Sequence, residues 1–446
     1  MTRTPLAAVV LAAGLGTRMR SRRPKHLHPL LGRRLVDWVV EAAGRLDPEP
    51  LVVVTSPDTR AELEGTLPQA ALVAVQEEPR GTGDAAAAAR TALAGFEGDV
   101  LVLAGDAPLL TTDVLEELLA VHRDEEAAVT VLSFEADEPG SYGRIVRDES
   151  GRLRAIVEAG DASPAELEIR ELNSSIYVFA AGDLWSALER LAPDNAQGEL
   201  YLTDAVRHLA DDGRAASVYR ASDPRAGEGV NTRADLAAAG AQLRAEILRR
   251  HMDAGVTVVD PGTTWIDADV AMEADVVVHP FTVLRGRTVV REGAEIGPHV
   301  VAVDAEVGPG VLVGPFCYLR PGTVLEAGAK AGTFVEIKNS RIGEGTKVPH
   351  LSYIGDADVG EGTNVGAGAI TANFPHEAGR PKGRTTIGRN VRTGIHNSFI
   401  APVKIDDSSW TAAGSVITDD VPPESLAGFP PRQVTKEGYL RGDRND

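Results

Sequence analysis

The second half of the chain repeats every six residues, and this rhythm constrains the fold more than any other feature. After Gly255 an aliphatic residue recurs, usually followed by glycine or by a small or acidic residue. Clear copies are Val307, Val313, Leu319, Leu325, Ala331, Ile337, Val348, Ile354, Val365, Ile387 and Ile405, with one-residue slips at Ile342 and Val359. Hexapeptide periodicity is typical of a parallel β-helix, in which each short strand forms one flat side of a coil. The flat faces of such a prism can associate, so we expect a homotrimer formed through the β-helix.

The first half alternates strands with helices instead. Apolar segments lie at 6–14, 51–55, 100–106 and 128–134, and amphipathic segments lie at 35–46 and 112–122. This alternation predicts a parallel, doubly wound sheet that binds ligands at the carboxyl ends of its strands. A helix with an Asn-Thr cap is predicted at its end. We therefore expect an α/β domain over 1–230, a linker helix over 231–252 and the β-helix over 253–446.

Charge and cysteine usage limit the partners and the location. The chain has 45 basic and 65 acidic side chains, for a net charge of −20. It therefore has no whole-surface attraction for nucleic acid or anionic membranes, and a polyanionic ligand has to be bound by a local pocket. No run of 18 apolar residues exists, so membrane insertion is not expected. Cys317 is the single cysteine, which excludes an internal disulfide and favours a reducing, cytoplasmic location.

A glycine loop carries the strongest local signal. The segment LAAGLGTRM runs from Leu11 to Met19 directly behind the first predicted strand, and Pro24-Lys25 follows shortly after. Backbone N–H groups in such a loop can approach phosphate oxygens closely, and Arg18 and Lys25 are spaced to clamp them. The segment is neither a dinucleotide fingerprint nor a P-loop.

A second polar set lies in the β-helix. Arg320, Lys338, His350 and Asn364 occupy outward positions of their repeats, because aliphatic residues fill the inward ones. Polar groups stacked coil upon coil predict a site on one face of the β-helix. Cys317, by contrast, falls at an inward corner position and is expected to be a small core residue.

From about Pro5 to Gly438 the chain resembles the bacterial bifunctional N-acetylglucosamine-1-phosphate uridylyltransferase/glucosamine-1-phosphate acetyltransferases. The resemblance rests on LAAGLGTRM with Pro24-Lys25, on QEEPRGTGDA around Gln76, and on the hexapeptide half. It implies a Rossmann-like nucleotidyltransferase domain followed by a left-handed parallel β-helix. The implied substrates are glucosamine 1-phosphate with acetyl-CoA, then N-acetylglucosamine 1-phosphate with UTP and Mg²⁺.

The resemblance also implies roles for residues of the first half. Lys25 and Arg18 would neutralise charge on the reacting phosphates, and Asp106 and Asn231 would bind Mg²⁺. The remaining nucleotide- and sugar-binding residues would be Leu11, Ala12, Ala13, Gly14, Gly16, Thr17, Gln76, Gly81, Thr82, Ala104, Gly105, Tyr142, Gly143, Arg144, Glu158 and Asn173. Ser174-Ser175 stands where this family usually has Thr-Gly.

In the second half His350 would be the general base of acetyl transfer. The acceptor would be held by Arg320, Lys338, Tyr353 and Asn364, and acetyl-CoA would contact Ala367, Asn373, Phe374, Ile395 and Ala413. Three positions depart from the family: Phe374 replaces Tyr, Ile395 replaces Ser and Pro430 replaces Arg, for which Arg432 could substitute. The segment 375–384 also looks longer than usual.

Two other functions stay open at this point. One is a pyrophosphorylase with a single activity, whose β-helix only oligomerises or regulates. The other is a non-catalytic regulatory subunit of the same architecture. The combination of His350, Lys338 and Arg320 argues against the first, and that of Lys25, Asp106 and Asn231 argues against the second.

Overall fold

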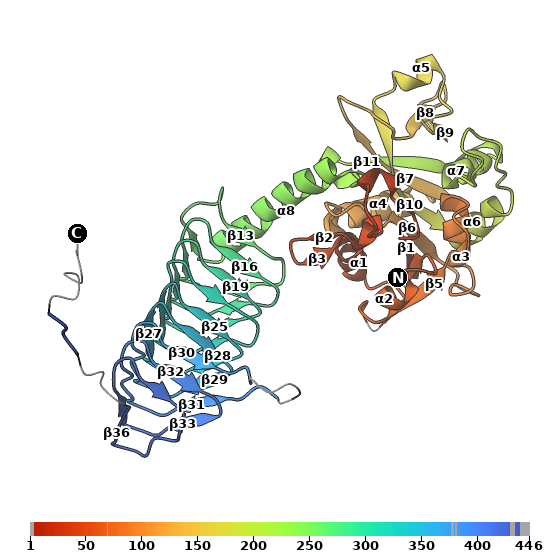
Figure 1. Ribbon diagram of the computed structural model, residues 1–446. Coiled ribbons are helices and arrows are strands. Elements are labelled where there is room, and N and C mark those ends of the chain that lie inside the picture. Colours follow the sequence, from red (N-terminus) through yellow and green to blue (C-terminus); the bar gives the residue numbers. More distant parts are fainter. Residues whose placement is uncertain (1–3, 69, 376–378, 380, 429–432, 438–446) are drawn as a thin grey trace, which may run out of the picture. The chain divides into compact units, whose positions relative to one another are not determined.

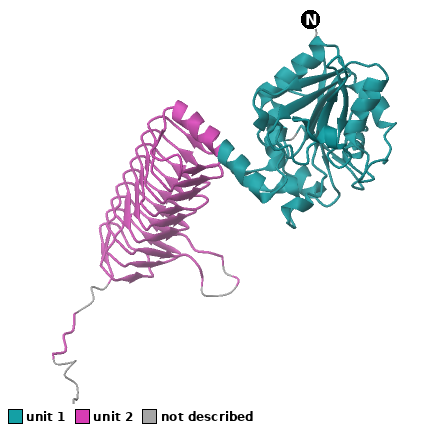
Figure 2. Cartoon of the chain, turned by 90° about the horizontal axis from the view of Figure 1, so that it is seen from above, with its two compact units in different colours: residues 1–243 teal, residues 244–446 magenta. Residues whose placement is uncertain are grey.

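The computed structural model describes residues 4–68, 70–375, 379, 381–428 and 433–437 of the chain. It divides into two compact units, residues 1–243 and 244–446 (Figure 2). The division falls inside α8 (Arg233–Asp253), the helix predicted at 231–252. Its predicted cap is present, because Thr232 Oγ1 accepts from Asp235 N at 3.1 Å and Asp235 Oδ2 accepts from Thr232 N at 2.8 Å. This reciprocal pair is a capping box.

Unit 1 is built on one mixed sheet (Figure 1). Its strand order is β11 (Ala216–Arg220), β7 (Val129–Glu135), β10 (Glu171–Ala180), β6 (Asp99–Ala104), β1 (Leu6–Leu11), β4 (Leu51–Thr55) and β5 (Ala71–Val75). The hairpin of β8 (Arg144–Arg147) and β9 (Leu153–Val157) attaches to β10. The predicted strands are confirmed, but the all-parallel sheet is wrong, since β10 runs antiparallel to both neighbours. A hairpin, not a crossover helix, precedes β10, so the chain returns in the opposite direction.

Helices cover both faces of this sheet. One face packs against α1 (Leu35–Gly44) and α4 (Thr112–Asp124), and the other against α3 (Thr82–Ala88), α6 (Ala181–Leu188) and α7 (Leu202–Asp211). Successive residues of a strand point to opposite faces. Ala8 and Val10 of β1 accordingly join the first core and Ala7 and Val9 the second. Shorter elements are α2 (Arg60–Glu64), α5 (Pro164–Leu167), β2 (Pro29–Leu30), β3 (Arg33–Arg34), η1 (Thr17–Met19), η2 (Lys25–Leu27) and η3 (Pro224–Gly227).

The strand order reverses between β1 and β6. From β1 the chain passes to β4 and β5 on one side and then returns to β6 on the other side of β1. A crevice opens at the carboxyl ends of two such strands, where α/β sheets bind their ligands. The glycine loop follows β1 and Asp106 follows β6, so both lie at this crevice.

Unit 2 consists of stacked short parallel strands, which form three sheets, as expected for the predicted left-handed β-helix (Figure 1). The six-stranded sheet contains β12 (Thr257–Val258), β15 (Val277–Val278), β18 (Glu295–Ile296), β21 (Leu312–Val313), β24 (Lys330–Thr333) and β27 (Lys347–His350). The nine-stranded sheet contains β13 (Trp265–Ile266), β16 (Val283–Arg285), β19 (Val301–Val303), β22 (Tyr318–Leu319), β25 (Glu336–Lys338), β28 (Tyr353–Gly355), β30 (Ile370–Ala372), β32 (Ser398–Ile400) and β35 (Val416–Ile417). The eight-stranded sheet contains β14 (Ala271–Met272), β17 (Val289–Val290), β20 (Glu306–Val307), β23 (Val324–Leu325), β26 (Arg341–Ile342), β29 (Ala357–Val359), β31 (Thr385–Ile387) and β33 (Val403–Ile405). β34 (Trp410–Thr411) pairs with β36 (Leu426–Ala427).

The predicted inward residues form the core of the β-helix. All thirteen repeat positions named above, from Val307 to Ile405, are at most 3% exposed. The slip at Ile342 marks a coil that is one residue shorter, since Leu325 pairs with Ile342 while Leu319 pairs with Ile337. Cys317 is buried as predicted, and its thiol donates to Gly332 O at 2.6 Å. Burial raises the pKa of this thiol to about 11.

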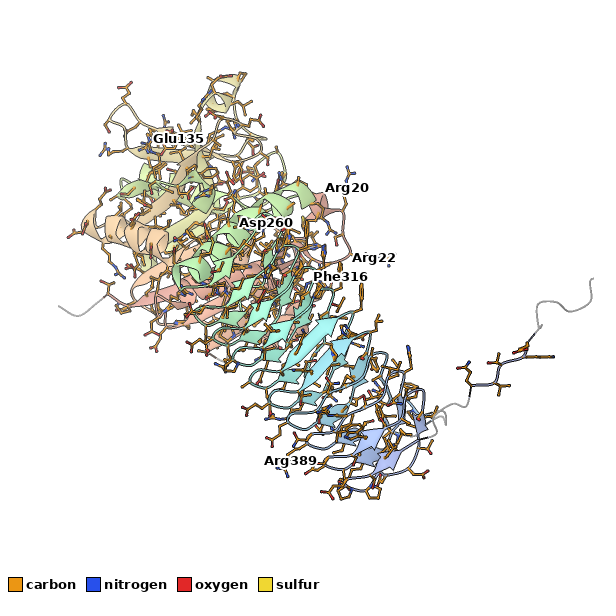
Figure 3. The ribbon with its side chains drawn as sticks, turned by 90° about the vertical axis from the view of Figure 1, so that its left-hand side faces the viewer. Arg20, Arg22, Glu135, Asp260, Phe316 and Arg389 are labelled. Carbon is orange, nitrogen blue, oxygen red and sulfur yellow. The ribbon has the colours of Figure 1, made fainter. Side chains whose placement is uncertain are left out.

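One corner of the β-helix carries a stack of aromatic rings. Phe281, His299, Phe316 and Phe334 follow one another with ring centroids 4.8, 4.8 and 5.1 Å apart. Figure 3 labels Phe316, whose side chain projects from the coils. The three phenylalanines are 46–56% exposed. Leu351, 59% exposed, also has a positive φ, and it continues this column beside His350.

Candidate active sites

The glycine loop of unit 1 brings Lys25 close to the end of β1. Gly16 has a φ of 61°, and a Cβ at this position would collide with Cβ of Lys25. Glycine tolerates both the left-handed conformation and the close contact. The loop can therefore fold back onto η2, which begins with Lys25.

Four predicted residues converge at the carboxyl ends of β1 and β6. The Lys25 ammonium forms an ion pair with Asp106 and donates to Asn231 Oδ1 at 3.0 Å. Arg18 also donates to Asn231 Oδ1, at 2.9 Å, and to Ser141 Oγ at 3.0 Å. The Lys25 and Asp106 side chains are only 16% and 17% exposed, so water screens their charges weakly.

A cavity of about 530 Å³ extends from this cluster. The predicted residues that line it are Leu11, Ala12, Ala13, Gly14, Gly16, Thr17, Arg18, Lys25, Gln76, Gly81, Thr82, Ala104, Gly105, Asp106 and Glu158. Asn231 reaches the same cluster through its bonds to Lys25 and Arg18. The order of these residues along the chain gives no indication of this convergence, which depends on the fold.

Gln76 and Thr82 line the cavity with side chains that are held in place. The Gln76 amide donates to Gly81 O at 3.0 Å and to Asp84 Oδ2 at 2.8 Å, and this leaves its amide oxygen as an acceptor. Thr82 Oγ1 accepts from Leu202 N at 3.0 Å. Both side chains are therefore held by the neighbouring backbone.

Glu158 also lines the cavity, near Gly143 and Asn173. Asn173 is 2% exposed, its N donates to Gly143 O at 2.9 Å, and its Nδ2 donates to the Tyr177 hydroxyl at 2.8 Å. Burial raises the pKa of Glu158, which accepts from Thr203 Oγ1 at 3.3 Å. Gly143 and Asn173 lie behind Glu158, since neither is among the residues that line the cavity.

Tyr142 and Arg144 are placed differently from Gly143. The Tyr142 hydroxyl accepts from Gly229 N at 3.0 Å, and so it fixes the loop that precedes Asn231. The Arg144 guanidinium donates to Tyr142 O and, at 3.3 Å, to Gly140 O. Both residues therefore hold loops in place.

In unit 2 four predicted residues form a column along one corner of the β-helix. His350, Ala367, Ile395 and Ala413 occupy equivalent positions of successive coils. Backbone bonds set this register: Gly368 N donates to His350 O at 3.4 Å, His396 N to Ala367 O at 2.7 Å and Gly414 N to Ile395 O at 2.8 Å. The predicted base thus shares one edge of the prism with three of the five predicted acetyl-CoA contacts, and Asn373 and Phe374 lie elsewhere.

A basic group lies at the carboxyl ends of the central strands of the nine-stranded sheet. Arg320 stands beside Lys338, because Arg320 N donates to Ile337 O at 2.8 Å. Lys338 pairs in register with Gly355, and a Cβ there would collide with the Tyr353 phenol. Tyr353 therefore folds over Gly355 toward Lys338. Asn364 does not join this group, since it lies on the face of the six-stranded sheet beside Lys347.

Asp356 holds neighbouring side chains in place at the carboxyl ends of these strands. It is 8% exposed, and it accepts hydrogen bonds from Asn339, at 2.5 Å, and from Asn373. Burial alone would raise the pKa of Asp356, but these two hydrogen bonds, with the charge of Lys338, hold it below the usual value. Asn373 is thereby fixed next to the basic group.

The comparisons with known proteins cover the whole chain. Residues 8–209 match the family described as MobA-like NTP transferase domain. The bifunctional protein GlmU of Mycolicibacterium gilvum (strain PYR-GCK) is 46% identical, over 98% of this chain and 92% of its own length. Those of Thermobifida fusca (strain YX) and Streptomyces coelicolor (strain ATCC BAA-471 / A3(2) / M145) are 45% and 48% identical, each over 99% of this chain and 95% of its own length.

This chain belongs to the GlmU family. The predicted resemblance is confirmed, and the chain is a bifunctional enzyme, a uridylyltransferase and an acetyltransferase of UDP-N-acetylglucosamine synthesis. A single-activity pyrophosphorylase and a non-catalytic subunit are not favoured. No helix within the described residues has the length and apolarity that crossing a membrane requires.

Two of the departures expected from the resemblance, Phe374 and Ile395, lie on exposed surface. Phe374 is 74% exposed and Ile395 is 52% exposed. Ile395 stands between the small residues Ala367 and Ala413 in the His350 column. Pro430 and Arg432 lie outside the described residues.

Two residues near these sites were missed by sequence reasoning. Lys382 belongs to the long segment 375–384; the Lys338 ammonium lowers its pKa, and its Nζ lies 5.6 Å from the Phe374 ring centroid. The unusual length of that segment was the available signal. His26 lines the cavity of unit 1 and is 3% exposed. Burial, with the charge of Lys25, lowers its pKa to about 4, so the ring is neutral at pH 7.

Proposed function

We propose that the cavity of unit 1 transfers the uridylyl group of UTP to N-acetylglucosamine 1-phosphate, and that the β-helix transfers the acetyl group of acetyl-CoA to glucosamine 1-phosphate. The observation that carries the first assignment is the half-buried cluster of Lys25, Asp106 and Asn231 behind a glycine loop. The column headed by His350, one short strand away from the basic group of Arg320 and Lys338, supports the second.

Uridylyl transfer needs positioning and charge neutralisation. The sugar phosphate oxygen attacks the α-phosphorus of UTP in line, the bond to the β-phosphate breaks, and pyrophosphate leaves. Lys25 and Arg18 carry two positive charges at the mouth of the glycine loop, where negative charge develops. The amide oxygen of Gln76 can accept the uracil N3–H, and such a contact discriminates against bases that lack this donor.

The oxygens of Asp106 and Asn231 suit Mg²⁺. Both residues bind the same Lys25 ammonium, so their oxygens converge on one cationic position. One carboxylate and one amide oxygen, completed by substrate phosphates, form a ligand set typical of a hard cation. Mg²⁺ bound there would neutralise phosphate charge. Asp106 and Asn231 would orient the phosphates, while Lys25 moves from the carboxylate toward the α-phosphate.

The sugar is proposed to bind beside Glu158, in the part of the cavity called here the sugar end. Gly143 lies beside this carboxylate, since a Cβ at this position would be in contact with Glu158 Oε1 at 3.5 Å. Sugar hydroxyl groups can donate to Glu158, and Asn173 fixes the surrounding loop. The triphosphate would lie near Lys25, so a sugar phosphate bound here would face it.

Acetyl transfer is proposed to use His350 as the general base. His350 removes a proton from the 2-ammonium group, the amine attacks the thioester carbon, and the CoA thiolate leaves. Arg320 and Lys338 would hold the sugar phosphate, with Lys382 as a third cation. The strands between the two groups are three residues long, about 10 Å. A sugar phosphate together with the side chains can span this length, and Tyr353 would orient the sugar.

The exposed aromatic stack supports the proposed homotrimer. An apolar stripe on a soluble protein marks an interaction surface. The stripe of Phe281, His299, Phe316 and Phe334 continues into Leu351, so a second copy seated there would lie next to His350. We expect Phe316→Glu with Phe334→Glu to convert a trimer into a monomer by light scattering; an unchanged mass would contradict this interface. Use of UTP and acetyl-CoA also fits the proposed cytoplasmic location.

One incubation tests both activities. The protein is supplied with glucosamine 1-phosphate, acetyl-CoA, UTP and Mg²⁺, and products are identified by mass. We expect N-acetylglucosamine 1-phosphate, then UDP-N-acetylglucosamine and pyrophosphate. If only externally added N-acetylglucosamine 1-phosphate were converted, the acetyltransferase assignment would be wrong.

A further inference from the structure

Ser175 adopts a backbone conformation that strands rarely contain. It lies inside β10 with a φ of 61°. The register between β10 and β7 shifts between Asn173 and Tyr177, so Ser175 belongs to an irregularity in the ladder. A left-handed non-glycine residue is strained, and such strain is found where surrounding contacts enforce it, often at functional sites.

The contacts that enforce this conformation come from the sugar end of the cavity. Ser175 N donates to Asn173 Oδ1 at 3.1 Å, while Asn173 Nδ2 donates to the Tyr177 hydroxyl at 2.8 Å. Burial raises the pKa of Tyr177, and hydrogen bonds from Asn173 and Ser175 oppose this shift. The three residues therefore form one polar network.

At this irregularity the hydroxyl groups of two adjacent serines lie in different environments. Ser174 is 5% exposed and its Oγ donates to Leu132 O at 2.7 Å, within the sheet. Ser175 is half-buried and lines the cavity together with Glu158, Tyr177 and Thr203. Glycine at position 175 would adopt the same φ without strain, but it would leave no hydroxyl in the cavity.

We propose that Ser175 is a specificity-determining residue whose hydroxyl hydrogen-bonds a polar substituent of the acceptor sugar. This inference rests on the proposed function of the cavity. A hydroxyl both donates and accepts, so it can bind a sugar hydroxyl or the acetamido group. The Tyr177 hydroxyl and the Asn173 amide orient it from behind. Ser175 thereby adds to the sugar end a contact that Glu158 alone does not supply.

The test compares Ser175→Ala and Ser175→Gly with the parent chain in the uridylyl reaction. Initial rates are measured with UTP and Mg²⁺ over a range of N-acetylglucosamine 1-phosphate. Both variants should raise KM for the sugar phosphate about fivefold, the factor that one neutral hydrogen bond of about 1 kcal/mol supplies. The kcat and the KM for UTP should stay within twofold, because the contact exists in ground and transition states alike.

Stability separates this role from a structural one. Ser175→Gly relieves the strained φ, so its Tm should be no lower than that of the parent although KM rises. Ser174→Ala is the matched control, because it removes a buried hydrogen bond one residue away. It should lower the Tm and leave KM for the sugar phosphate unchanged. A rise in KM that occurred only together with a fall in Tm would overturn the proposal.

Substrate analogues identify the group that Ser175 binds. The same KM ratio is measured with glucose 1-phosphate, which lacks the acetamido group, and with the 3-, 4- and 6-deoxy forms of the N-acetylated substrate. For one analogue the effect of Ser175→Ala should disappear, since the partner of the hydroxyl is already missing. An equal effect with every analogue, or no effect with any, would overturn the inference alone. A parent chain without uridylyl activity would instead overturn the proposed function itself.

Discussion

The two candidate sites are built in opposite ways. In unit 1 Lys25, Asp106 and Asn231 come from distant parts of the chain and meet in a half-buried cluster. In unit 2 Arg320 and Lys338 are one coil apart and lie on an open face. The exposed fractions of the ion-paired side chains express the difference: 16% and 17% for Lys25 and Asp106, against 35% and 40% for Arg320 and Glu336. Each pair of charges in unit 1 therefore interacts more strongly. In unit 2 ligand binding depends instead on several charged residues that recur on successive coils.

The two architectures therefore suit different kinds of ligand binding. A crevice at strand ends excludes water around a triphosphate, so a few charges have large effects. A face of the β-helix binds its ligand along a line of equivalent positions on successive coils. Each residue there contributes a smaller part of the binding free energy. Separate chemistry in separate units also implies that each activity can be removed without the other.

The largest expected effect is the loss of acetyl transfer in His350→Ala. A general base contributes about 10²–10⁴-fold, so kcat for acetyl transfer should fall by this factor. Uridylyl transfer from UTP to N-acetylglucosamine 1-phosphate should stay within twofold, because no residue of unit 1 changes. Coupled assays of CoA release and pyrophosphate release measure the two rates on one sample.

His279→Ala is the matched control for this experiment. His279 is another imidazole on the β-helix, and it bonds to Glu295 at 2.8 Å, outside the proposed site. It should leave both rates near those of the parent. Simultaneous loss of both activities in His350→Ala would break the comparison between the two units.

Asp106→Ala should produce the reverse pattern. The carboxylate pairs with Lys25 and is the proposed metal ligand, so its loss removes charge organisation worth several kcal/mol. Pyrophosphate release should fall at least about 100-fold, and acetyl transfer should be unchanged. The exposed Asp211 offers a control carboxylate in the same unit. Full uridylyl transfer in Asp106→Ala would mean that the cation is bound elsewhere.

A third prediction concerns the stability of unit 1 against acid. The folded-state pKa of His26 is lowered to about 4, below the usual 6.5. The unfolded chain therefore binds a proton below pH 6.5, while the folded chain does so only near pH 4. His26 thus lowers stability progressively as pH falls through this window, by up to about 3 kcal/mol.

His26→Leu tests this prediction. The stability that the variant loses between pH 7 and pH 4.5 should be smaller than that lost by the parent. Urea unfolding followed by the helical circular-dichroism signal reports mainly on unit 1, which contains most of the helices. Parallel pH profiles for the two proteins would contradict the burial of His26 as a neutral ring.

The sequence was a better guide to unit 2 than to unit 1. The six-residue period alone identified the inward residues and placed Arg320 and Lys338 on an outward face, because each position depends only on its coil. It could not place Lys382, since the path of the long segment 375–384 has no period. It also did not show that the His350 column and the basic group of Arg320 and Lys338 lie at opposite ends of the same short strands.

In unit 1 the motif identified the glycine loop, but its partners depend on the fold. The antiparallel β10 was not predicted, because the hairpin before it has no distinctive pattern. Without β10 neither the irregularity at Ser175 nor its access to the cavity could be inferred. The sequence around His26 likewise gives no sign that its ring is buried, so its lowered pKa could not be predicted.

The smallest expected effect concerns the departures on the acetyl-CoA side. Phe374 and Ile395 are exposed and lack the hydroxyl groups usual in the GlmU family, so we expect weakened binding of acetyl-CoA. One neutral hydrogen bond contributes about 1 kcal/mol. The variant Phe374→Tyr with Ile395→Ser should therefore lower KM for acetyl-CoA about fivefold if one hydrogen bond is restored and up to about thirtyfold if both are. The kcat should stay within twofold, since these groups would bind the cofactor in ground and transition states alike. Uridylyl transfer should not change. Initial rates over a range of acetyl-CoA check this; an unchanged KM would show that Lys382, stacked on Phe374, and the backbone already compensate for the missing hydroxyls.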